Sequence, residues 1–403
     1  MANLWYHGFH RICNRIYFAR VTVLHPERLP KTGPVMYLGL HRNGAVDGFI
    51  YHALLPRAVF LISTQLRRNP LGRLFFSGIE VVRDKDKGQS GNDPDTNVEA
   101  LKCCRELLRS GGELFIFPEG TSSLGPRHLP FKSGAARLLL DSLSASKPIQ
   151  VIPLGIHYEC AWAFRSKVEV VVGRPIGVVL PAALRPLERI KEMKRRIQFA
   201  LEEVGINVTS PEYQETIQRL AYVATLATPR SYFKTLKALE KSIPEKILQA
   251  SRALEPELRT RKLLCHQGVP LFPMGPVSLY LLALVVLAPL VIIGAWFNLP
   301  PILAAWWAGK KVSDDSNVIS LWRILVGLPL FVSWALLVMV VAMVLGKWAW
   351  LAVYVAATGA ALKLYYRVKK LAVTVHNGLR YRELRAPLLA FRETVLESLP
   401  DEN

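Results

Sequence analysis

The stretch VMYLGLHRNGAVDGF, residues 35–49, decides the fold class. Val35–Leu40 is an apolar run of strand length, and the HRNG segment that follows it is typical of a turn. An apolar helical pattern begins directly after this turn. A strand, a glycine-containing turn and a helix are the repeating unit of α/β domains, which place their polar chemistry at the carboxyl ends of strands. The stretch therefore predicts an α/β domain with His41 and Asp47 at a strand end.

The same alternation of short apolar runs and helical patterns extends over residues 20–205 and predicts a sheet flanked by helices. Besides Val35–Leu40, the predicted strands are Ala58–Ile62, Glu80–Val82, Leu114–Phe117, Gln150–Ile156 and Val168–Val172. Thr96–Ser110 and residues 182–204 predict helices, the first with Asp95 as its N-cap. Residues 84–97 are polar and contain glycine, so they predict a mobile surface loop.

The composition indicates a protein that works at a membrane. Of 403 residues, 51% are hydrophobic, and 51 Lys and Arg against 31 Asp and Glu give a formal net charge of +20. Such a charge suits nucleic acid or the anionic surface of a membrane, since both present dense phosphate charge. The long apolar segments described below favour the membrane, so we expect membrane lipid and no nucleic acid as a partner. A solvated basic surface without a partner is the alternative.

The cysteines indicate neither a metal site nor a disulfide framework. The five, Cys13, Cys103, Cys104, Cys160 and Cys265, show no metal-ligand or disulfide spacing. Arginines interrupt the apolar residues near the N-terminus, so we expect no signal-peptide core there. These features predict that the α/β domain faces a reducing cytosol.

Uncharged regions in the C-terminal half predict membrane segments. Gln267–Gly309 contains no Asp, Glu, Lys or Arg, and Val277–Trp296 alone is long enough to cross a hydrocarbon core of about 30 Å. The rest of this region is roughly half a span long, so Val277–Gly309 predicts one span with a partial one, or a re-entrant hairpin. Ile324–Gly346 and Trp348–Leu362 predict a tight hairpin of two further segments.

The charges around these segments predict their orientation. The second pair of segments is expected to turn at Gly346 and Lys347. Basic residues flank the membrane region at both ends: Arg259, Arg261, Lys262, Arg367, Lys369 and Lys370. Because basic flanks stay on the cytosolic side, we expect a multi-pass membrane protein with its catalytic domain on the cytoplasmic face.

These patterns divide the chain into five expected parts. They are an amphipathic N-terminal helix at residues 1–19, the α/β domain at 20–205, a helical connecting segment at 206–270, an α-helical membrane region at 271–370 and a C-terminal cytoplasmic tail at 371–403. The N-terminal helix has two interpretations, a helix that lies in the membrane interface and a core helix packed on the domain. The connecting segment carries no recognisable chemistry.

His41 and Asp47 are candidates for a general base and the carboxylate that orients it. Six residues of regular helix rotate by about 600°, so the two side chains meet only if Arg42–Gly44 is non-helical. In such a pair Asp47 fixes the imidazole tautomer, and the other ring nitrogen takes a proton from a hydroxyl. A structural histidine is the alternative, and the pair by itself does not decide between the two.

A second group of polar residues follows another predicted strand. Phe117–Ser122 reads FPEGTS at the end of that strand, and Leu129–Ala135 reads LPFKSGA. A carboxylate, a glycine and hydroxyls at a strand end, with Lys132 opening the next helix, are typical of a site for phosphate and glycerol. Together with His41 and Asp47, this group favours chemistry on a phosphate-bearing substrate.

In this order the motifs resemble the glycerophospholipid acyltransferase family, which includes glycerol-3-phosphate and lysophosphatidate acyltransferases. The resemblance covers about residues 20–180. The segment SGIEVVRDK, with Gly78 and Arg83, fits the second motif of the family, and VIPLGIHY, with Pro153, fits the fourth. The FPEGTS segment is similar to the third motif.

The resemblance implies a role for each candidate residue. His41 and Asp47 would perform the chemistry. The residues in contact with the acceptor would be Arg83, Glu119, Gly120, Thr121 and Lys132. In two places the sequence departs from the family pattern. Five residues instead of four separate His41 from Asp47, a spacing similar to that in the branch near the fungal glycerol-3-phosphate acyltransferases. At the second place, Ser122 replaces the Arg that usually follows FPEGT. Without this Arg, binding of the acceptor phosphate would depend more on Arg83 and Lys132.

The resemblance thus implies an O-acyltransferase with an acyltransferase-type α/β sheet. It would transfer a fatty acyl group from acyl-CoA or acyl-carrier protein to a hydroxyl of glycerol-3-phosphate or a lysophospholipid, in phospholipid biosynthesis. We expect no cofactor or metal, and the absence of a GxSxG motif disfavours an acyl-serine route. The alternatives are a membrane acyltransferase for another lipid acceptor and a non-catalytic phospholipid-binding membrane protein. Acceptor identity, acyl chain length and oligomeric state stay open.

Overall fold

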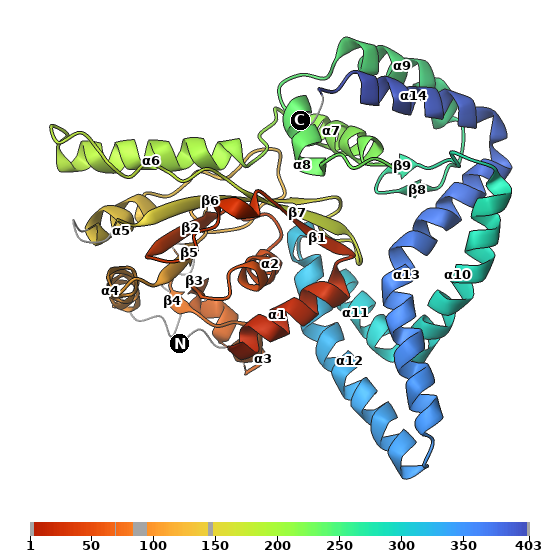
Figure 1. Cartoon of the computed structure of the whole chain (residues 1–403), viewed down its shortest axis with the longest axis horizontal. Coiled ribbons are helices and arrows are strands. Elements are labelled where there is room, and N and C mark those ends of the chain that lie inside the picture. The colour runs from red at the N-terminus through yellow and green to blue at the C-terminus, as the bar shows by residue number, and fades with distance from the viewer. Residues whose placement is uncertain (1–3, 69, 84–94, 144–147, 401–403) are drawn as a thin grey trace.

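A seven-stranded mixed sheet forms the centre of the N-terminal half in a computed structural model that describes residues 4–68, 70–83, 95–143 and 148–400 (Figure 1). The strands lie in the order β1-β7-β6-β2-β5-β3-β4. Their bounds are β1 Arg20–Leu24, β2 Val35–Gly39, β3 Ala58–Ser63, β4 Ile79–Val81, β5 Glu113–Ile116, β6 Gln150–Tyr158 and β7 Lys167–Val172. Neighbouring strands are parallel except β6 and β7. The predicted α/β sheet is confirmed.

Each predicted strand is present, with ends that differ by at most two residues from the predicted ones. The edge strand β1 was not predicted. Within the described part of the chain it pairs only with β7, and it is partly exposed along its length, so its sequence RVTVL lacks the uniform apolar character of a central strand. Residues 84–94 of the predicted surface loop lie outside the described residues.

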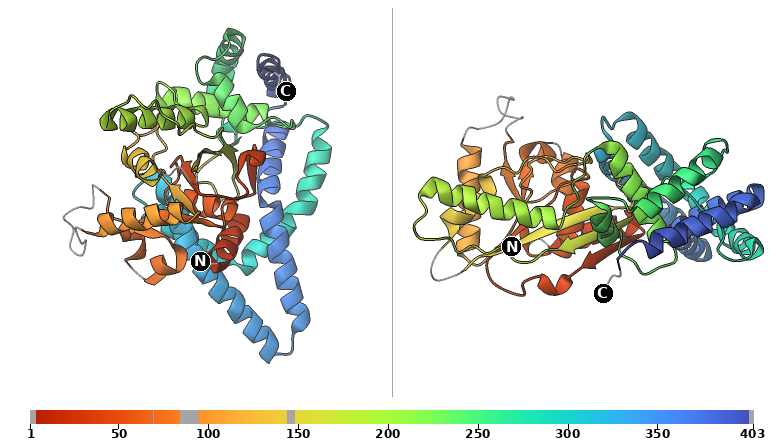
Figure 2. Two further views of the ribbon diagram at one scale, coloured as in Figure 1. Left: turned by 60° about the vertical axis from the view of Figure 1, so that its left-hand side comes forward. Right: turned by 90° about the horizontal axis from the view of Figure 1, so that it is seen from above.

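Side chains alternate along each strand, and the two faces of the sheet have separate hydrophobic clusters. Val35 and Tyr37 pack in the cluster that includes side chains of α1 and α2, whereas Met36 and Leu38 pack in the cluster of α4, α5 and α6. The bounds are α1 Leu4–Tyr17, α2 Val46–Leu54, α3 Pro70–Phe75, α4 Thr96–Arg109, α5 Gly134–Ser142 and α6 Pro186–Glu203. Figure 2 shows helices on both sides of the sheet, which is therefore the middle layer of three.

Both helices predicted in this domain are present; α4 begins at Thr96 as predicted, whereas α6 begins later than predicted. Asp95 occupies the N-cap position of α4, but its side chain makes no capping hydrogen bond. The helix α6 begins at Pro186, four residues later than predicted, because the proline favours the first turn of a helix. At the N-terminus, Cys13 and Tyr17 of α1 are buried in the domain core, which agrees with the packed interpretation of this helix.

The connecting segment forms a helical layer beside the sheet domain. It contains α7 Pro211–Ala224, α8 Tyr232–Leu239, α9 Glu245–Arg259 and a small hairpin of β8 Cys265–His266 and β9 Val269–Pro270. The segment expected as a C-terminal tail packs into this layer, because α14 (Arg385–Glu397) lies against α7 and α9. Val395 is fully buried among side chains of α7 and α8. The boundaries of the five expected parts stay predictions.

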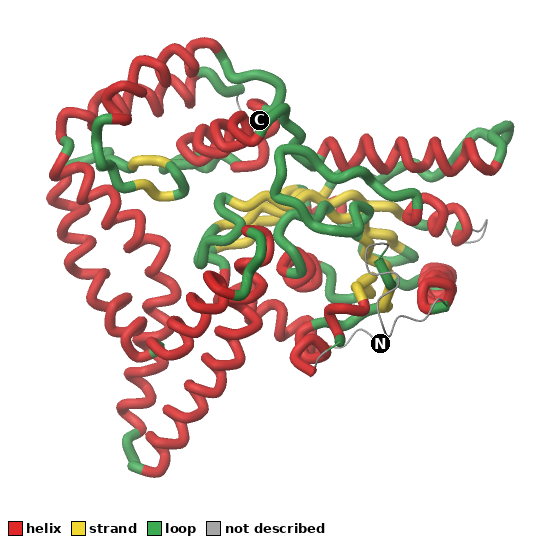
Figure 3. Tube along the Cα trace, turned by 180° about the vertical axis from the view of Figure 1, so that it is seen from behind, coloured by secondary structure: helices red, strands yellow, loops and turns green. Residues whose placement is uncertain are grey.

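Four C-terminal helices make a V-shaped projection (Figures 1 and 3). They are α10 Val277–Phe297, α11 Leu299–Lys311, α12 Ile319–Val344 and α13 Trp348–Arg380. Among the described residues, two helices are long and apolar enough to cross a membrane by length and composition, Val277–Phe297 and Ser316–Val344. With 13 residues, α11 is about 20 Å long and therefore too short to cross a membrane. This length agrees with the expected partial span after Val277–Trp296.

The predicted turn at Gly346 and Lys347 is present, but the hairpin is not tight. Gly346 adopts a φ of 62° between α12 and α13. The two helices then separate, and α13 packs along α10 whereas α12 packs along α11. Therefore α12 and α13 pack mainly against α11 and α10 and have few contacts with each other.

Gly294 permits the close approach of α10 to α13. A Cβ atom at this position would lie 2.4 Å from the Cβ of Ala361 and 2.5 Å from the carbonyl oxygen of Ala357. One turn farther on, the buried Asn298 accepts a hydrogen bond from Tyr354 Oη (2.8 Å). Small residues and buried polar contacts are the usual means of joining helices in an apolar environment.

We predict that Gly294→Val destabilises the α10–α13 pair by roughly 1–3 kcal/mol, because the added side chain overpacks the contact. Thermal unfolding of the full chain in detergent should show a lower Tm. Gly359→Val is the matched control, since a Cβ at Gly359 of α13 meets no atom within 4 Å. Equal Tm values for the two variants would contradict the role of Gly294.

Candidate functional site

The predicted site residues follow strands whose carboxyl ends share one edge of the sheet. The strands β2, β5, β3 and β4 are parallel neighbours, so the residues after them lie along that edge. His41 follows β2, the FPEGTS turn follows β5 and Arg83 follows β4. This edge of a parallel sheet is the usual place for ligands in open α/β folds.

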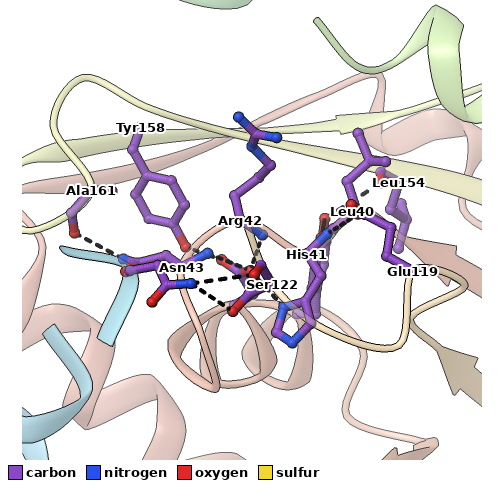
Figure 4. Close-up of polar contacts among 12 residues, drawn as sticks. Leu40, His41, Arg42, Asn43, Glu119, Ser122, Leu154, Tyr158 and Ala161 are labelled. Carbon is purple, nitrogen blue, oxygen red and sulfur yellow. Dashed lines mark hydrogen bonds and ion pairs between the residues drawn. The ribbon is translucent and has the colours of Figure 1, made fainter. Parts of the chain in front are cut away.

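His41 and Asp47 form a hydrogen-bonded pair; Figure 4 shows His41 with its neighbours Arg42, Asn43 and Tyr158. Nδ1 of His41 lies 3.0 Å from Oδ2 of Asp47. Residues 41–45 are non-helical, Gly44 has a φ of 53°, and Asp47 lies in the first turn of α2. The expectation that a non-helical turn lets the two side chains meet is confirmed.

Asp47 is fully buried, and four donors hold its carboxylate. Besides His41, the backbone N–H groups of Arg42 (2.5 Å) and Asn43 (2.8 Å) donate to Oδ2, and the hydroxyl of Tyr158 donates to Oδ1 (2.5 Å). A carboxylate out of contact with water needs such hydrogen-bond donors, because burial of its oxygens without them is costly. Burial and the neighbouring charge of Asp47 raise the pKa of Tyr158 well above its ordinary value, so Tyr158 keeps its proton as a donor.

Tyr158 is a site residue that the sequence analysis did not identify. It ends β6, which runs parallel to β2 and extends four residues beyond Leu154, the partner of the last residue of β2. This extension carries the ring over the start of α2. The only signal in the sequence was its place at the end of the VIPLGIHY motif.

Glu119 connects the HRNG turn after β2 to the LPFKSGA segment. Oε1 accepts a hydrogen bond from the backbone N–H of His41 (2.8 Å), and Oε2 accepts one from Leu129 (3.0 Å). Burial raises the pKa of Glu119, while these backbone donors oppose that change. The structure therefore shows Glu119 as the residue that fixes the backbone of His41, and its contact with an acceptor stays a prediction.

Lys132 lies over the FPEGTS turn, next to Gly120. Gly120 adopts a φ of 73°, and a Cβ there would lie 3.2 Å from Cε and 3.3 Å from Nζ of Lys132. The backbone N–H of Lys132 donates to Pro118 (2.9 Å), which fixes the side chain beside the turn. Thr121 is half-buried in the same turn. The exposed ammonium group thus provides a positive charge at this strand end.

Arg83 lies farther along the edge than the other predicted residues. It follows β4, three strand positions from β2, which corresponds to roughly 14 Å at ordinary strand spacing. Its Nη2 donates to Oε1 of Gln65 (2.8 Å). The structure therefore brings His41, Asp47, Glu119, Gly120 and Lys132 together and places Arg83 at the far end of the edge.

A segment from the C-terminal half completes the surroundings of the two motif loops. Nδ2 of Asn317 donates to Oγ of Ser122 (3.2 Å), and a Cβ at Gly44 would lie 2.9 Å from the carbonyl oxygen of Asn317. Three residues on, Oγ of Ser320 donates to the carbonyl of Ala161 (2.7 Å). The start of α12 is therefore seated against the candidate site.

Part of the sequence is similar to known proteins. Residues 20–157 match the model of the Acyltransferase family. The 1-acyl-sn-glycerol-3-phosphate acyltransferase LPAT1 of Arabidopsis thaliana is 30% identical over 139 residues, 34% of this chain and 37% of that protein. The glycerol-3-phosphate O-acyltransferase 2 of Saccharomyces cerevisiae is 30% identical over 125 residues, 29% of this chain and 16% of that protein.

A solved structure is also similar. The 1-acyl-sn-glycerophosphate acyltransferase PlsC of Thermotoga maritima matches with a TM-score of 0.35 and 20% identity over 49% of this chain and 78% of that one. The curated relatives are matched over 16% to 38% of their own length. Residues 20–157 of the chain are thus similar to the Acyltransferase family.

Proposed function

We propose that the protein is a membrane-bound O-acyltransferase of phospholipid biosynthesis. It transfers a fatty acyl group from acyl-CoA or acyl-carrier protein to a hydroxyl of a phosphate-bearing glycerol acceptor, glycerol-3-phosphate or a lysophospholipid. The observation that carries this proposal is the His41–Asp47 pair after the carboxyl end of β2, within the residues that match the Acyltransferase family. The names of the similar proteins support the glycerol-type acceptor.

The pair has the geometry of a base and its orienting carboxylate. The Asp47 carboxylate accepts the Nδ1 proton of His41, so the lone pair of the neutral ring lies on Nε2. The imidazole stacks on Phe117 with ring centroids 4.0 Å apart, and its side chain is 15% exposed. The ring is therefore held in one orientation and still reaches a substrate.

The proposed reaction is a direct transfer in one site. Nε2 of His41 takes the proton from the acceptor hydroxyl while the hydroxyl oxygen forms a bond to the thioester carbonyl carbon. The carbonyl oxygen becomes an oxyanion, and its collapse breaks the carbon–sulfur bond. The imidazolium, stabilised by Asp47, returns the proton to the departing thiolate.

The acceptor phosphate is proposed to bind beside Lys132. The side chain of Lys132 packs on Gly120, whose missing Cβ leaves room for close approach to the turn. A Lys ammonium binds phosphate through charge-assisted hydrogen bonds. Arg83 at the far end of the edge is in a position to contact a longer acceptor.

The apolar helices are proposed to anchor this domain at the cytoplasmic face of a membrane in several passes. Two of them have the length and composition of spans, and their outer surfaces expose large apolar side chains such as Val286, Ile292 and Val344. Such exposure is unfavourable in water and favourable in lipid. Attachment here keeps a fatty product next to the membrane that receives it.

Substitution of His41 tests the proposal directly. We expect His41→Ala to lose acyl transfer by about 100-fold or more, because general-base catalysis contributes this much, without a lower Tm. Purified membranes would be incubated with labelled acyl-CoA and glycerol-3-phosphate, dihydroxyacetone phosphate or lysophosphatidate. His25→Ala is the control, since His25 follows β1 at the opposite edge of the sheet. Near-normal turnover of His41→Ala would refute the proposed role.

Neutralising Lys132 tests the acceptor side. We expect Lys132→Gln to raise the acceptor KM by about tenfold or more, the equivalent of one charge-assisted hydrogen bond, and to leave the donor KM unchanged. Arg83→Gln should have a smaller effect on a short acceptor because of its distance from the pair. Arg137→Gln, an exposed cation on α5, controls for the loss of charge. A change in the donor KM alone would move Lys132 to the thioester side.

Removal of one hydroxyl tests the support of Asp47. Tyr158→Phe should lower kcat by about tenfold, since a hydrogen bond to a buried charge is lost and Asp47 is less firmly oriented. Tyr51→Phe is a matched control, because the hydroxyl of Tyr51, which is also buried, donates to backbone carbonyls of Leu40 and Leu154 instead of the carboxylate (both 3.3 Å). Equal losses in kcat for the two variants would show that Tyr158 acts through packing.

A further inference from the structure

A large cavity lies on the other side of the HRNG turn from the imidazole of His41. Its volume is about 800 Å³, which is ordinary for a ligand site. The loop from Tyr158 to Phe164, between β6 and β7, forms one wall, and residues of α7, α12 and α13 form the others. Figure 4 shows that the side chain of Arg42 points away from the ring of His41, and Arg42 lines this cavity.

The cavity has an excess of positive charge. Its charged lining residues are Arg42, Arg219, Arg323, Lys369, Glu159 and Glu215. Both acids are already engaged, Glu159 by Tyr366 and Lys167 and Glu215 by Arg219. Three cations then remain without a carboxylate hydrogen bond in the described part of the chain. They are Arg42, which donates to the carbonyl of Gly125, Arg323, which donates to the carbonyl of Trp162, and Lys369.

Two side chains of the lining have buried polar atoms without partners among the described residues. These atoms are Nη1 of Arg42 and both ring nitrogens of His128. Buried polar atoms are nearly always paired in folded proteins, so unpaired ones beside a cavity indicate a ligand or water that supplies the missing partner. Next to arginine and lysine, the fitting partner is an anion with several acceptor oxygens, such as phosphate.

Given the proposed function, we infer that this cavity binds the phosphate-bearing pantetheine arm of the acyl donor. The acceptor then approaches His41 from the β5 side, where Lys132 lies, and the donor approaches from the β6–β7 side. The aromatic wall of Trp162, Phe164 and Tyr365 suits the uncharged part of the arm, and the cations suit its phosphate. The inference rests on the proposed function and adds the location of the second substrate.

The position of the cations gives the C-terminal half a role in catalysis. Arg323 and Lys369, two of the three cations without a carboxylate hydrogen bond, belong to α12 and α13, both outside the matched residues 20–157. The acyltransferase domain alone therefore contributes only one side of the donor site. Helices that carry the apolar spans form the other side, so donor binding depends on their docking.

Kinetics of charge variants in the full chain test the inference. Lys369→Ala should raise the KM for acyl-CoA by about tenfold and Lys369→Glu by more, while kcat and the acceptor KM stay within about twofold. Arg367→Ala is the matched control, because this exposed cation of α13 lies two residues away and does not line the cavity. Lower membrane affinity from lost charge would affect both positions alike.

A donor without phosphate makes the test specific. The KM for an acyl thioester of N-acetylcysteamine should be high in the unmodified protein and unchanged by Lys369→Ala. Acyl-carrier protein is the second donor that carries a phosphopantetheine arm. If Lys369→Ala raises the KM for acyl-carrier protein as much as the KM for acyl-CoA, the phosphopantetheine of either donor binds in this cavity. If only the KM for acyl-CoA rises, the cavity is assigned to CoA. An unchanged donor KM for both sources, or a rise in the acceptor KM instead, would overturn the inference.

Failure of the inference and failure of the proposed function give different results. Calorimetric titration of CoA into the purified protein measures donor binding without turnover, and Lys369→Glu should weaken it by about tenfold or more. Normal acyl transfer with CoA affinity unaffected by Lys369→Glu would overturn the donor site alone. Absence of acyl transfer to every acceptor would overturn the proposed function and with it this assignment.

Discussion

The buried carboxylate of Asp47 is the constraint on which the candidate site depends. Oδ2 accepts hydrogen bonds from the side chain of His41 and the backbone N–H groups of Arg42 and Asn43, while Oδ1 accepts one from Tyr158. Two backbone donors can reach one oxygen only if the chain turns around it, so the charge of Asp47 determines the shape of the turn. The same turn aims His41 and Arg42 in opposite directions. One buried charge thus arranges both sides of the site.

Much of the sheet could be predicted because its central strands are buried on both faces. The sequence of β2 is apolar throughout, and the polar residues of β5 and β6, Glu113, Gln150 and His157, lie near the strand ends and do not obscure the apolar runs. The edge strand β1 has one neighbour and a mixed sequence, so no run marks it. Pairing of His41 with Asp47 was predictable from the glycine and asparagine in the turn, since both residue types tolerate non-helical backbone.

The remaining site residues could not be predicted, because long-range contacts leave no local pattern. Tyr158 is 111 residues from Asp47, and Asn317 is 195 residues from Ser122. The sequence around Tyr158 and around Asn317 contains no spacing of residues that marks either one as a site residue. The structural role of Glu119 was not predictable for a related reason. A motif shows which residue type stands at a position, whereas only the geometry shows that its oxygens hold the backbone of His41 and Leu129.

The seating of α12 against the motif loops links the apolar helices to the chemistry. Ile324 and Leu328 of α12 belong to the same hydrophobic cluster as the sheet, α1 and α2, so the helix cannot shift without opening the domain core. At its start, Asn317 contacts Ser122 and the backbone of Asn317 approaches Gly44, which leaves no room for a side chain there. Movement of the helix would therefore displace the turn that holds Asp47. A site built in this way is fully assembled only when the apolar helices are in place, so the geometry of the His41–Asp47 pair depends on the folding of the C-terminal half.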